Sequence, residues 1–256
     1  MSGLEALAEM EYPGRVIIIG KSTENHDVVL YAVTGRSTSS QERTIKMDEG
    51  MERFEVQPFK EAKITDEQRA LLEYPAIMVK NFRSGIVVSN GKQTTDFVKR
   101  KHNKKFLFFG QNNAVQVLER ALKNWSYEPD EPNYTPRISG CILPGSAALS
   151  IIKRSWDMKP EKHYFEVPLV NGKGKMIATY TGVNVNPLPS FQGEPINVNI
   201  QWFTARDAVE AMYEALAPKE GKPDFRVAVA GIYINRNQKF YDVNAHVKNR
   251  HEVRRK

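Results

Sequence analysis

Residues 227–234 of this 256-residue chain read Val-Ala-Val-Ala-Gly-Ile-Tyr-Ile, and residues 16–20 read Val-Ile-Ile-Ile-Gly. Neither stretch alternates between apolar and polar side chains. A strand with one face in water alternates, whereas a continuous apolar run is typical of a strand that is covered on both faces. We therefore predict that these two strands are covered on both faces by other parts of the fold.

Strand-like runs dominate the remainder of the chain, and helical signals are few. The predicted strands span residues 16–20, 28–35, 44–48, 77–82, 85–89, 137–143, 148–153, 164–169, 175–183, 198–201, 226–234 and 239–247. Helices are predicted after Thr65, over 113–125 and after Thr204, which forms a capping-box pattern with Asp207. Many short strands without strict strand–helix alternation favour the α+β class with mostly antiparallel sheets.

The chain contains no repeat and no Gly/Ser-rich linker, so we expect one domain over residues 12–246. Residues 1–11 are interpreted as an N-terminal extension and 247–256 as a basic C-terminal tail. The single cysteine, Cys141, excludes an intrachain disulfide, and the five histidines lack ligand spacing, so no metal site is expected. No apolar run approaches the ~18 residues that span a bilayer. Without a signal-peptide pattern, we expect a cytoplasmic protein with no membrane partner.

The net charge of +7 is concentrated in two segments. Residues 99–105 hold five Lys/Arg and no acid, and residues 247–256 hold five Lys/Arg and one Glu, so the remainder of the chain carries −2. Solvated surface segments explain this distribution most simply, and nucleic acid is an unlikely partner. Weak binding of a polyanion by these segments is the alternative.

The common cofactor motifs are absent. The sequence has no phosphate-binding loop with its lysine, no complete dinucleotide fingerprint and no G-x-S-x-G nucleophile elbow. We expect no cofactor. The residue types left for chemistry are Arg, Asn, Glu and Asp on turns.

Four polar segments are candidates for a site. Residues 35–44 carry Arg36 and Arg43, and arginine suits phosphate because its planar fork bonds bidentately. In residues 89–96, Asn90-Gly91 is a hairpin signal, although Thr95 and Asp96 would then face a pocket beyond the turn. Residues 127–140 and 186–195 are proline-rich, which limits the entropy cost of fixing polar side chains. Each segment also has a purely structural alternative. Residues 35–44 would be a solvated connection and 89–96 a plain hairpin. Residues 127–140 would be a rigid connector and 186–195 a packed loop.

Taken together and in order, these segments resemble the IMP cyclohydrolase-like family. The resemblance rests on Tyr12-Pro-Gly-Arg15 with the following apolar run, Gly35-Arg36-Ser37 with Arg43, Ser89-Asn90-Gly91, Glu128 to Gly140 (EPDEPNYTPRISG) and Asn186 to Pro195 (NPLPSFQGEP). It covers roughly residues 12–235. It implies an Ntn-hydrolase-like four-layer αββα sandwich of two mostly antiparallel sheets, here without an N-terminal nucleophile at the first strand.

The resemblance also implies a reaction. The family enzyme closes 5-formamidoimidazole-4-carboxamide ribotide to IMP with loss of water, in the last step of de novo purine synthesis, without a cofactor. This chemistry requires a phosphate anchor, a proton acceptor for the amide nitrogen and a donor for the formyl oxygen. The partner is thus a small-molecule nucleotide, and a homo-oligomer is possible.

By motif position, Glu128 and Arg43 are the implied catalytic residues. Further contacts with the nucleotide are expected from six residues: Arg36, Asn133, Arg137, Asn90, Thr95 and Asp96. The family also has a tyrosine on the strand at 77–82, where this sequence aligns Val79, with Tyr74 five residues earlier. Two alternatives remain open: a purine-nucleotide-binding protein, and a different ribotide amide hydrolase using the same pocket.

Overall fold

The apolar runs form the centres of two antiparallel sheets in the computed structural model, which describes residues 3–59, 72–81, 85–97, 113–236 and 242–253. Both sheets are antiparallel and the helices are few, so the α+β prediction is confirmed. None of the described helices is both long enough and apolar enough to cross a membrane.

The first sheet has six strands and contains both continuous apolar runs, residues 16–20 and 227–234. In spatial order its strands are β11 (Ile196–Asn199), β10 (Lys173–Ala178), β1 (Arg15–Lys21), β2 (Asp27–Thr34), β12 (Arg226–Asn235) and β13 (Asp242–Asn249). Residues 16–20 and 227–234 are buried throughout, which confirms that these strands are covered on both faces. Every residue of β2, the strand between them, is buried as well.

The second sheet has seven strands that follow chain order. They are β3 (Arg43–Met47), β4 (Arg53–Pro58), β5 (Tyr74–Asn81), β6 (Gly85–Ser89), β7 (Arg137–Leu143), β8 (Ser146–Arg154) and β9 (Pro160–Glu166). The sequence analysis missed β4, because only its alternate residues Phe54 and Val56 are large, apolar and buried. An isolated alternation of this length, interrupted by charges, gives a weak signal.

The two sheets pack face to face around a common core. Ile17 of β1 reaches toward β7, where a Cβ added to Gly140 would lie 3.5 Å from its Cγ2 atom. One cluster of buried side chains includes members of both sheets, among them Tyr31, Phe54 and Ile138. The sheets therefore form one hydrophobic unit.

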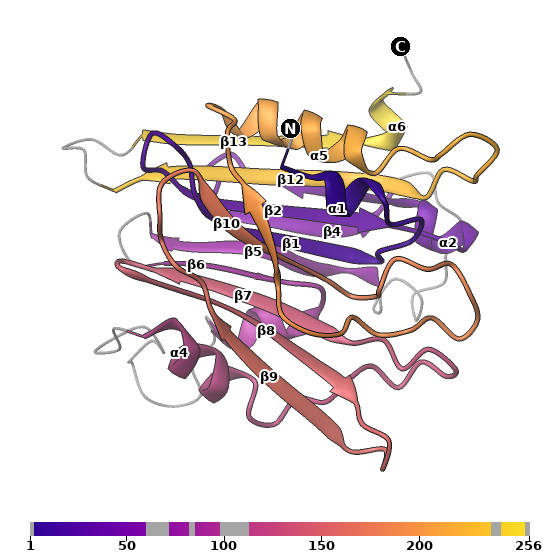
Figure 1. The fold of residues 1–256 in the computed structure, drawn as a ribbon. Helices are drawn as coiled ribbons and strands as arrows, with labels where there is room; N and C mark the ends of the chain where they lie inside the picture. Colours follow the sequence, from indigo (N-terminus) through magenta and orange to yellow (C-terminus); the bar gives the residue numbers. More distant parts are fainter. Residues whose placement is uncertain (1–2, 60–71, 82–84, 98–112, 237–241, 254–256) are drawn as a thin grey trace.

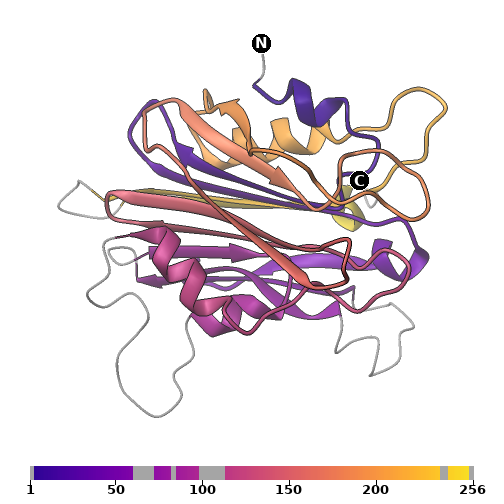
Figure 2. The ribbon, with the colours of Figure 1, turned by 60° about the horizontal axis from the view of Figure 1, so that its bottom comes forward.

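Two helices lie on the outer faces of this pair of sheets (Figures 1 and 2). Helix α5 (Ala205–Ala215) covers β12 and β13, and α4 (Ala114–Ala121) covers β7 and β8. The predicted cap of α5 is confirmed, because the Thr204 hydroxyl accepts a hydrogen bond from the Asp207 amide at 3.1 Å. The helix predicted after Thr65 lies outside the described residues.

A second apolar cluster lies beneath α4, on the outer face of the seven-stranded sheet. It consists of Val87, Phe97, Ala114, Val117, Leu118, Leu122, Cys141, Leu143, Ala148 and Ile152. Cys141 is fully buried there, and burial raises the pKa of its thiol. The cysteine thus packs as a small apolar side chain, as predicted.

The segments interpreted as extensions are built into the fold where the structure describes them. Leu4 and Leu7, on and beside helix α1 (Glu5–Ala8), are buried in the common core. At the other end, Lys248 lies in β13, and Arg250 of α6 (Arg250–Val253) is buried and donates to the carbonyls of Asp224 and Arg226. These two basic side chains therefore serve the fold. The basic stretch 99–105 lies outside the described residues.

Candidate active site

Several of the candidate site residues gather where strands begin or end at one end of the two sheets. Because neighbouring strands run antiparallel, the start of β1, the end of β2 and the starts of β3, β5 and β7 all lie at this end. The short helix α2 (Thr38–Gln41), between β2 and β3, marks this end in Figure 1. Side chains on the inner faces here point into the space between the sheets.

Two arginines form the centre of the site, Arg43 buried and Arg15 partly buried, and we call Arg15 and Arg43 the arginine pair. Arg43 is 1% exposed, and its Nε and Nη2 atoms donate to the carbonyls of Ser40 and Thr34 at 2.8 and 3.2 Å. Its Nη1 atom and the Nε atom of Arg15 are buried without a hydrogen-bond partner. Buried donors are normally paired, so these two N–H groups call for an acceptor.

The pKa values of the arginine pair reflect their proximity. Burial and then the positive charge of Arg15 lower the pKa of Arg43. Burial also acts to lower the pKa of Arg15, but Tyr74, Tyr31 and Glu128 act against it and raise the pKa above its usual value. Arg15 thus lies within electrostatic reach of both Arg43 and Glu128. Two like charges that interact with little exposure to water favour binding of an anion at the pair.

A pair of tyrosines joins the two sheets beside the arginines, and we call Tyr31 and Tyr74 the tyrosine pair. Tyr31 extends from β2 and Tyr74 from β5, and their hydroxyl oxygens are 2.8 Å apart in a buried hydrogen bond. Burial, followed by the neighbouring Tyr74, raises the pKa of Tyr31. A tyrosine hydroxyl is therefore available as a neutral donor next to the arginine pair.

Tyr74, and not Val79, lies beside the arginine pair. Strand β5 begins at Tyr74, three residues earlier than predicted, and Tyr74 lies at the end of the strand that faces the arginine pair. Val79 is five residues further along, roughly 16 Å away at the usual rise of a strand. Its amide donates to the carbonyl of Glu52 at the opposite end of the sheet. Val79 is therefore remote from the arginine pair, and Tyr74 is the tyrosine of this strand that lies beside it.

Glu128 and Arg137 form an ion pair at the same end. The Arg137 Nη1 atom lies 3.2 Å from the Glu128 Oε1 atom and 3.0 Å from the Gln93 Oε1 atom. The Arg137 guanidinium also stacks over the Trp125 ring at 4.8 Å. Burial lowers the pKa of Arg137, and Glu128 acts in the opposite direction. The Glu128 side chain remains 28% exposed, so it is held in place and still accessible.

Comparison with known proteins identifies relatives of the chain. A sequence model of the family described as IMP cyclohydrolase-like protein matches residues 12–238. The chain belongs to the IMP cyclohydrolase-like family. It is also similar to the IMP cyclohydrolase of Methanocaldococcus jannaschii, with 28% identity over 188 residues that cover 72% of this chain and 81% of the relative. The family match includes the arginine pair, the tyrosine pair and Glu128.

Asn90-Gly91 has a different role from the predicted hairpin. Strand β6 pairs with β7 across the sheet, and the chain after Gly91 enters the 3-10 helix η1 (Lys92–Phe97). The Asn90 amide donates to the Pro136 carbonyl at 2.8 Å and accepts from the Ile138 amide at 3.0 Å. The hairpin prediction was wrong, because the Asn90 side chain ties β6 to the start of β7. Its hydrogen bonds are directed to the protein and not toward a nucleotide.

Gly91 leaves room for the ion pair of this family member. A Cβ atom added there would lie 2.7 Å from the Arg137 Nη1 atom and 3.5 Å from the Glu128 Oε1 atom. The glycine is thus required by the close approach of Arg137 and not by a hairpin turn.

Thr95 and Asp96 are not brought to the arginine pair. The Thr95 hydroxyl donates to the Lys92 carbonyl within η1. The Asp96 carboxylate accepts from the Trp125 indole at 2.9 Å, on the outer side of the sheet. Thr95 thus stabilises η1, and Asp96 holds the Trp125 ring on which Arg137 stacks.

Arg36 and Asn133 hold the second proline-rich loop of the family motif against the site. The Arg36 Nη1 atom donates to the Val185 carbonyl at 2.9 Å, and the guanidinium lies over the Tyr12 ring at 5.7 Å. The Asn133 Oδ1 atom accepts from the Leu188 amide at 3.0 Å. These two residues therefore position the loop, which leaves the remaining Arg36 donors and the Asn133 amide nitrogen for other contacts.

Sequence reasoning missed Arg15, Tyr31 and Gln93 as site residues. Arg15 was quoted only as part of a motif, although a charged first residue on an otherwise apolar strand was a usable signal. Tyr31 lies inside a continuous apolar run and carries no such signal.

Among the residues that the structure describes, no group of three or more His, Cys, Asp or Glu is arranged to hold a metal ion.

Proposed function

We propose that this protein is an IMP cyclohydrolase, which closes 5-formamidoimidazole-4-carboxamide ribotide to IMP with loss of water. The observation that carries the proposal is the arginine pair with its unpartnered N–H groups, next to the tyrosine pair and within electrostatic reach of Glu128. An anionic substrate with a reacting carbonyl fits this donor-rich site. Membership of the family supports the same conclusion.

The reaction sets the tasks of the residues. The carboxamide nitrogen forms a bond to the formyl carbon and loses one proton, while the formyl oxygen gathers negative charge and becomes a hydroxyl. That hydroxyl then leaves as water, and the formamido nitrogen loses the second proton. The site must therefore accept a proton from a weakly acidic amide and donate to an oxygen at the same carbon.

We assign the proton-accepting role to Glu128. Its carboxylate is positioned by Arg137 and is accessible, as a general base that must reach a substrate proton requires. Arg137 acts as a positioning residue in this assignment, since it contacts Glu128, Gln93 and the Trp125 ring. We assign the Tyr74 hydroxyl as the donor to the formyl oxygen. This hydroxyl already takes part in a hydrogen bond with Tyr31.

Arg43 is assigned to an anionic oxygen of the substrate, through its unpartnered Nη1 atom. That oxygen is either on the phosphate or on the formyl group during ring closure. The two choices differ in kinetics. Loss of a phosphate contact raises KM, whereas loss of a contact made only in the transition state lowers kcat.

We further propose that the fold is the Ntn-hydrolase-like αββα sandwich that the resemblance implies. The outer positions of α5 and α4 around two antiparallel sheets support it. Strand β1 begins at Arg15, after helix α1, so no amino-terminal nucleophile is assigned here.

The test is a spectrophotometric assay that follows IMP formation from the formylated ribotide. Wild type is expected to form IMP, and Glu128→Gln and Arg43→Ala to lose at least ~100-fold in turnover, since each removes a positioned polar group. Glu166→Gln, which changes an exposed carboxylate on β9, is the matched control and should retain activity. Comparing Tyr74→Phe with Tyr31→Phe identifies the hydroxyl on which turnover depends.

Two results would contradict the proposal. Turnover of Glu128→Gln within a few-fold of wild type would remove Glu128 from the mechanism. Binding of the ribotide by wild type without IMP formation would indicate a nucleotide-binding protein that uses the same pocket.

A further inference from the structure

Strand β13 is an edge strand that lacks several of the usual protections against pairing. Among the described strands it pairs with β12 alone, through eight consecutive residue pairs and with no bulge. Edge strands are normally shortened, bulged, interrupted by proline, covered or supplied with charged side chains, because their free N–H and C=O groups can pair with another chain. Of these protections, β13 has charged side chains at Asp242 and Lys248. The sequence of β13, DVNAHVKN, contains no proline.

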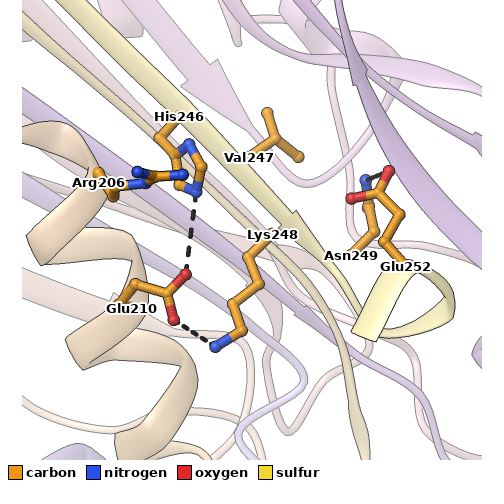
Figure 3. Close-up of a pocket in the computed structure, with 7 residues that line it drawn as sticks. All are labelled: Arg206, Glu210, His246, Val247, Lys248, Asn249 and Glu252. Carbon is orange, nitrogen blue, oxygen red and sulfur yellow. Dashed lines mark hydrogen bonds and ion pairs between the residues drawn. The ribbon is translucent and has the colours of Figure 1, made fainter. Parts of the chain in front are cut away.

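A groove runs beside this edge. A cavity of about 380 Å³ is lined by Arg206 and Glu210 of α5, by four consecutive β13 residues starting at His246, and by Glu252 of α6. Figure 3 shows Lys248 and His246 reaching across it toward Glu210. In the second half of β13, His246, Val247 and Lys248 are partly exposed, whereas Asn249 is buried against β3.

The two faces of β13 differ in chemistry. Asn244 accepts from the amide of Ala205 at the start of α5, and Lys248 contacts Glu210, so even-numbered side chains face α5. On the other face, Val243, Ala245 and Val247 pack against the core but remain only partly buried. The strand thus retains apolar surface at the sheet edge.

We propose that β13 pairs antiparallel with β13 of a second copy of this chain, about a twofold axis at Ala245. This register places Asp242 opposite Lys248 of the other copy, Val243 opposite Val247, Asn244 opposite His246 and Ala245 opposite itself. Opposite charges then meet on the face toward α5, and apolar side chains meet on the other face. Cross-strand pairs of both kinds stabilise paired strands. The two six-stranded sheets become one continuous sheet.

The charge pattern selects this register over its neighbours. A shift by one residue places Asp242 opposite Asn249 or Val247, and in the first of these Lys248 faces Val243. A one-residue slip also moves side chains to the wrong face relative to their partners. The partner is therefore a second copy, since the strand is complementary to itself.

The first experiment is a charge exchange followed by sedimentation equilibrium over a range of concentrations. Wild type is expected to dimerise, and Lys248→Asp and Asp242→Lys to raise the dimer dissociation constant at least tenfold, because each places like charges opposite each other. The double variant should restore the wild-type constant. Lys46→Asp, on an exposed part of β3, is the control and should leave it unchanged.

The charge variants also change an ion pair inside one copy, because Lys248 contacts Glu210. The second experiment therefore tests the register by cross-linking, without changing a charge. Ala245→Cys places two thiols opposite each other across the axis, within the Cα separation that a disulfide accepts. It should form a linked dimer on mild oxidation, because Cys141 is buried and does not compete. In Val243→Cys the two thiols lie roughly 13 Å apart along the strands, so no link should form.

A wild type that stays monomeric at all concentrations would overturn the proposal. So would a dimer that neither single charge variant weakens, or cross-linking that is equal at positions 243 and 245.

Discussion

Inorganic phosphate should stabilise the protein through the arginine pair. The Arg43 Nη1 atom and the Arg15 Nε atom are buried donors without acceptors, and the positive charge of Arg15 contributes to the lowered pKa of Arg43. Uncompensated buried charge is costly, and an anion that bonds these groups relieves that cost. Because the anion binds the folded state only, it raises the free energy of unfolding by RT ln(1 + [L]/Kd).

The expected gain in the free energy of unfolding can be worked out from a typical dissociation constant and phosphate concentration. A site with a dissociation constant of about 1 mM, in about 10 mM phosphate, gains roughly 1.4 kcal/mol. For a chain of this size, 1 kcal/mol corresponds to roughly 2–4 °C in Tm, so the expected rise is roughly 3–6 °C.

The assay is thermal unfolding with and without phosphate, with sodium chloride added to match ionic strength. Arg43→Met removes the unpartnered donor and should abolish the phosphate-dependent rise, whatever its effect on the starting Tm. Lys46→Met, on the exposed part of the same strand, should retain the full rise. An equal rise in Arg43→Met and wild type, or no rise in wild type, would refute the reasoning about the arginine pair.

Two further predictions concern stability. The Arg226 guanidinium bonds both Asp224 carboxylate oxygens at 3.0 Å, and although burial acts to raise the pKa of Asp224, these bonds lower it. Asp224→Asn should therefore cost about 1–2 kcal/mol at pH 7. A carboxyl with a depressed pKa contributes stability above its unfolded pKa of about 3.9 and loses it as pH falls through the folded value, so urea titrations should show the difference shrinking below about pH 4. Leu7 is fully buried, so Leu7→Ala should cost about 2–5 kcal/mol in urea unfolding, whereas Ala6→Ser on the exposed side of α1 should change stability by less than about 0.5 kcal/mol. An unchanged midpoint for Leu7→Ala would mean that α1 is not part of the cooperative fold.

The central strands were predictable because burial on both faces leaves a continuous apolar run in the sequence. Strand β7 has the predicted bounds. Strand β1 is one residue longer than predicted at each end, and β12 is one residue longer at its C-terminal end. Strand β5 was predicted to begin too late, since Pro75 reads as a break in a strand. In the fold, Pro75 lies next to a bulge in the pairing with β4, where the irregularity accommodates it.

The site was only partly predictable, because its polar groups come from both sheets. Motif position indicated Arg43 and Glu128, and both lie at the same end of the fold. Tyr31 could not be assigned from the sequence, since its partner Tyr74 is 43 residues away and only the packing of the two sheets brings them together. Asn90 was misinterpreted because the partners of its amide, Pro136 and Ile138, are equally remote in the chain.

The position of Cys141 has a practical consequence. It lies in the cluster beneath α4, which is separate from the core between the sheets. A thiol reagent reaches it only when α4 lifts from β7 or when the whole chain unfolds, and these two events depend differently on denaturant. The rate of thiol modification in the native protein therefore measures the local opening of one outer layer, with a chemical probe that the chain already contains.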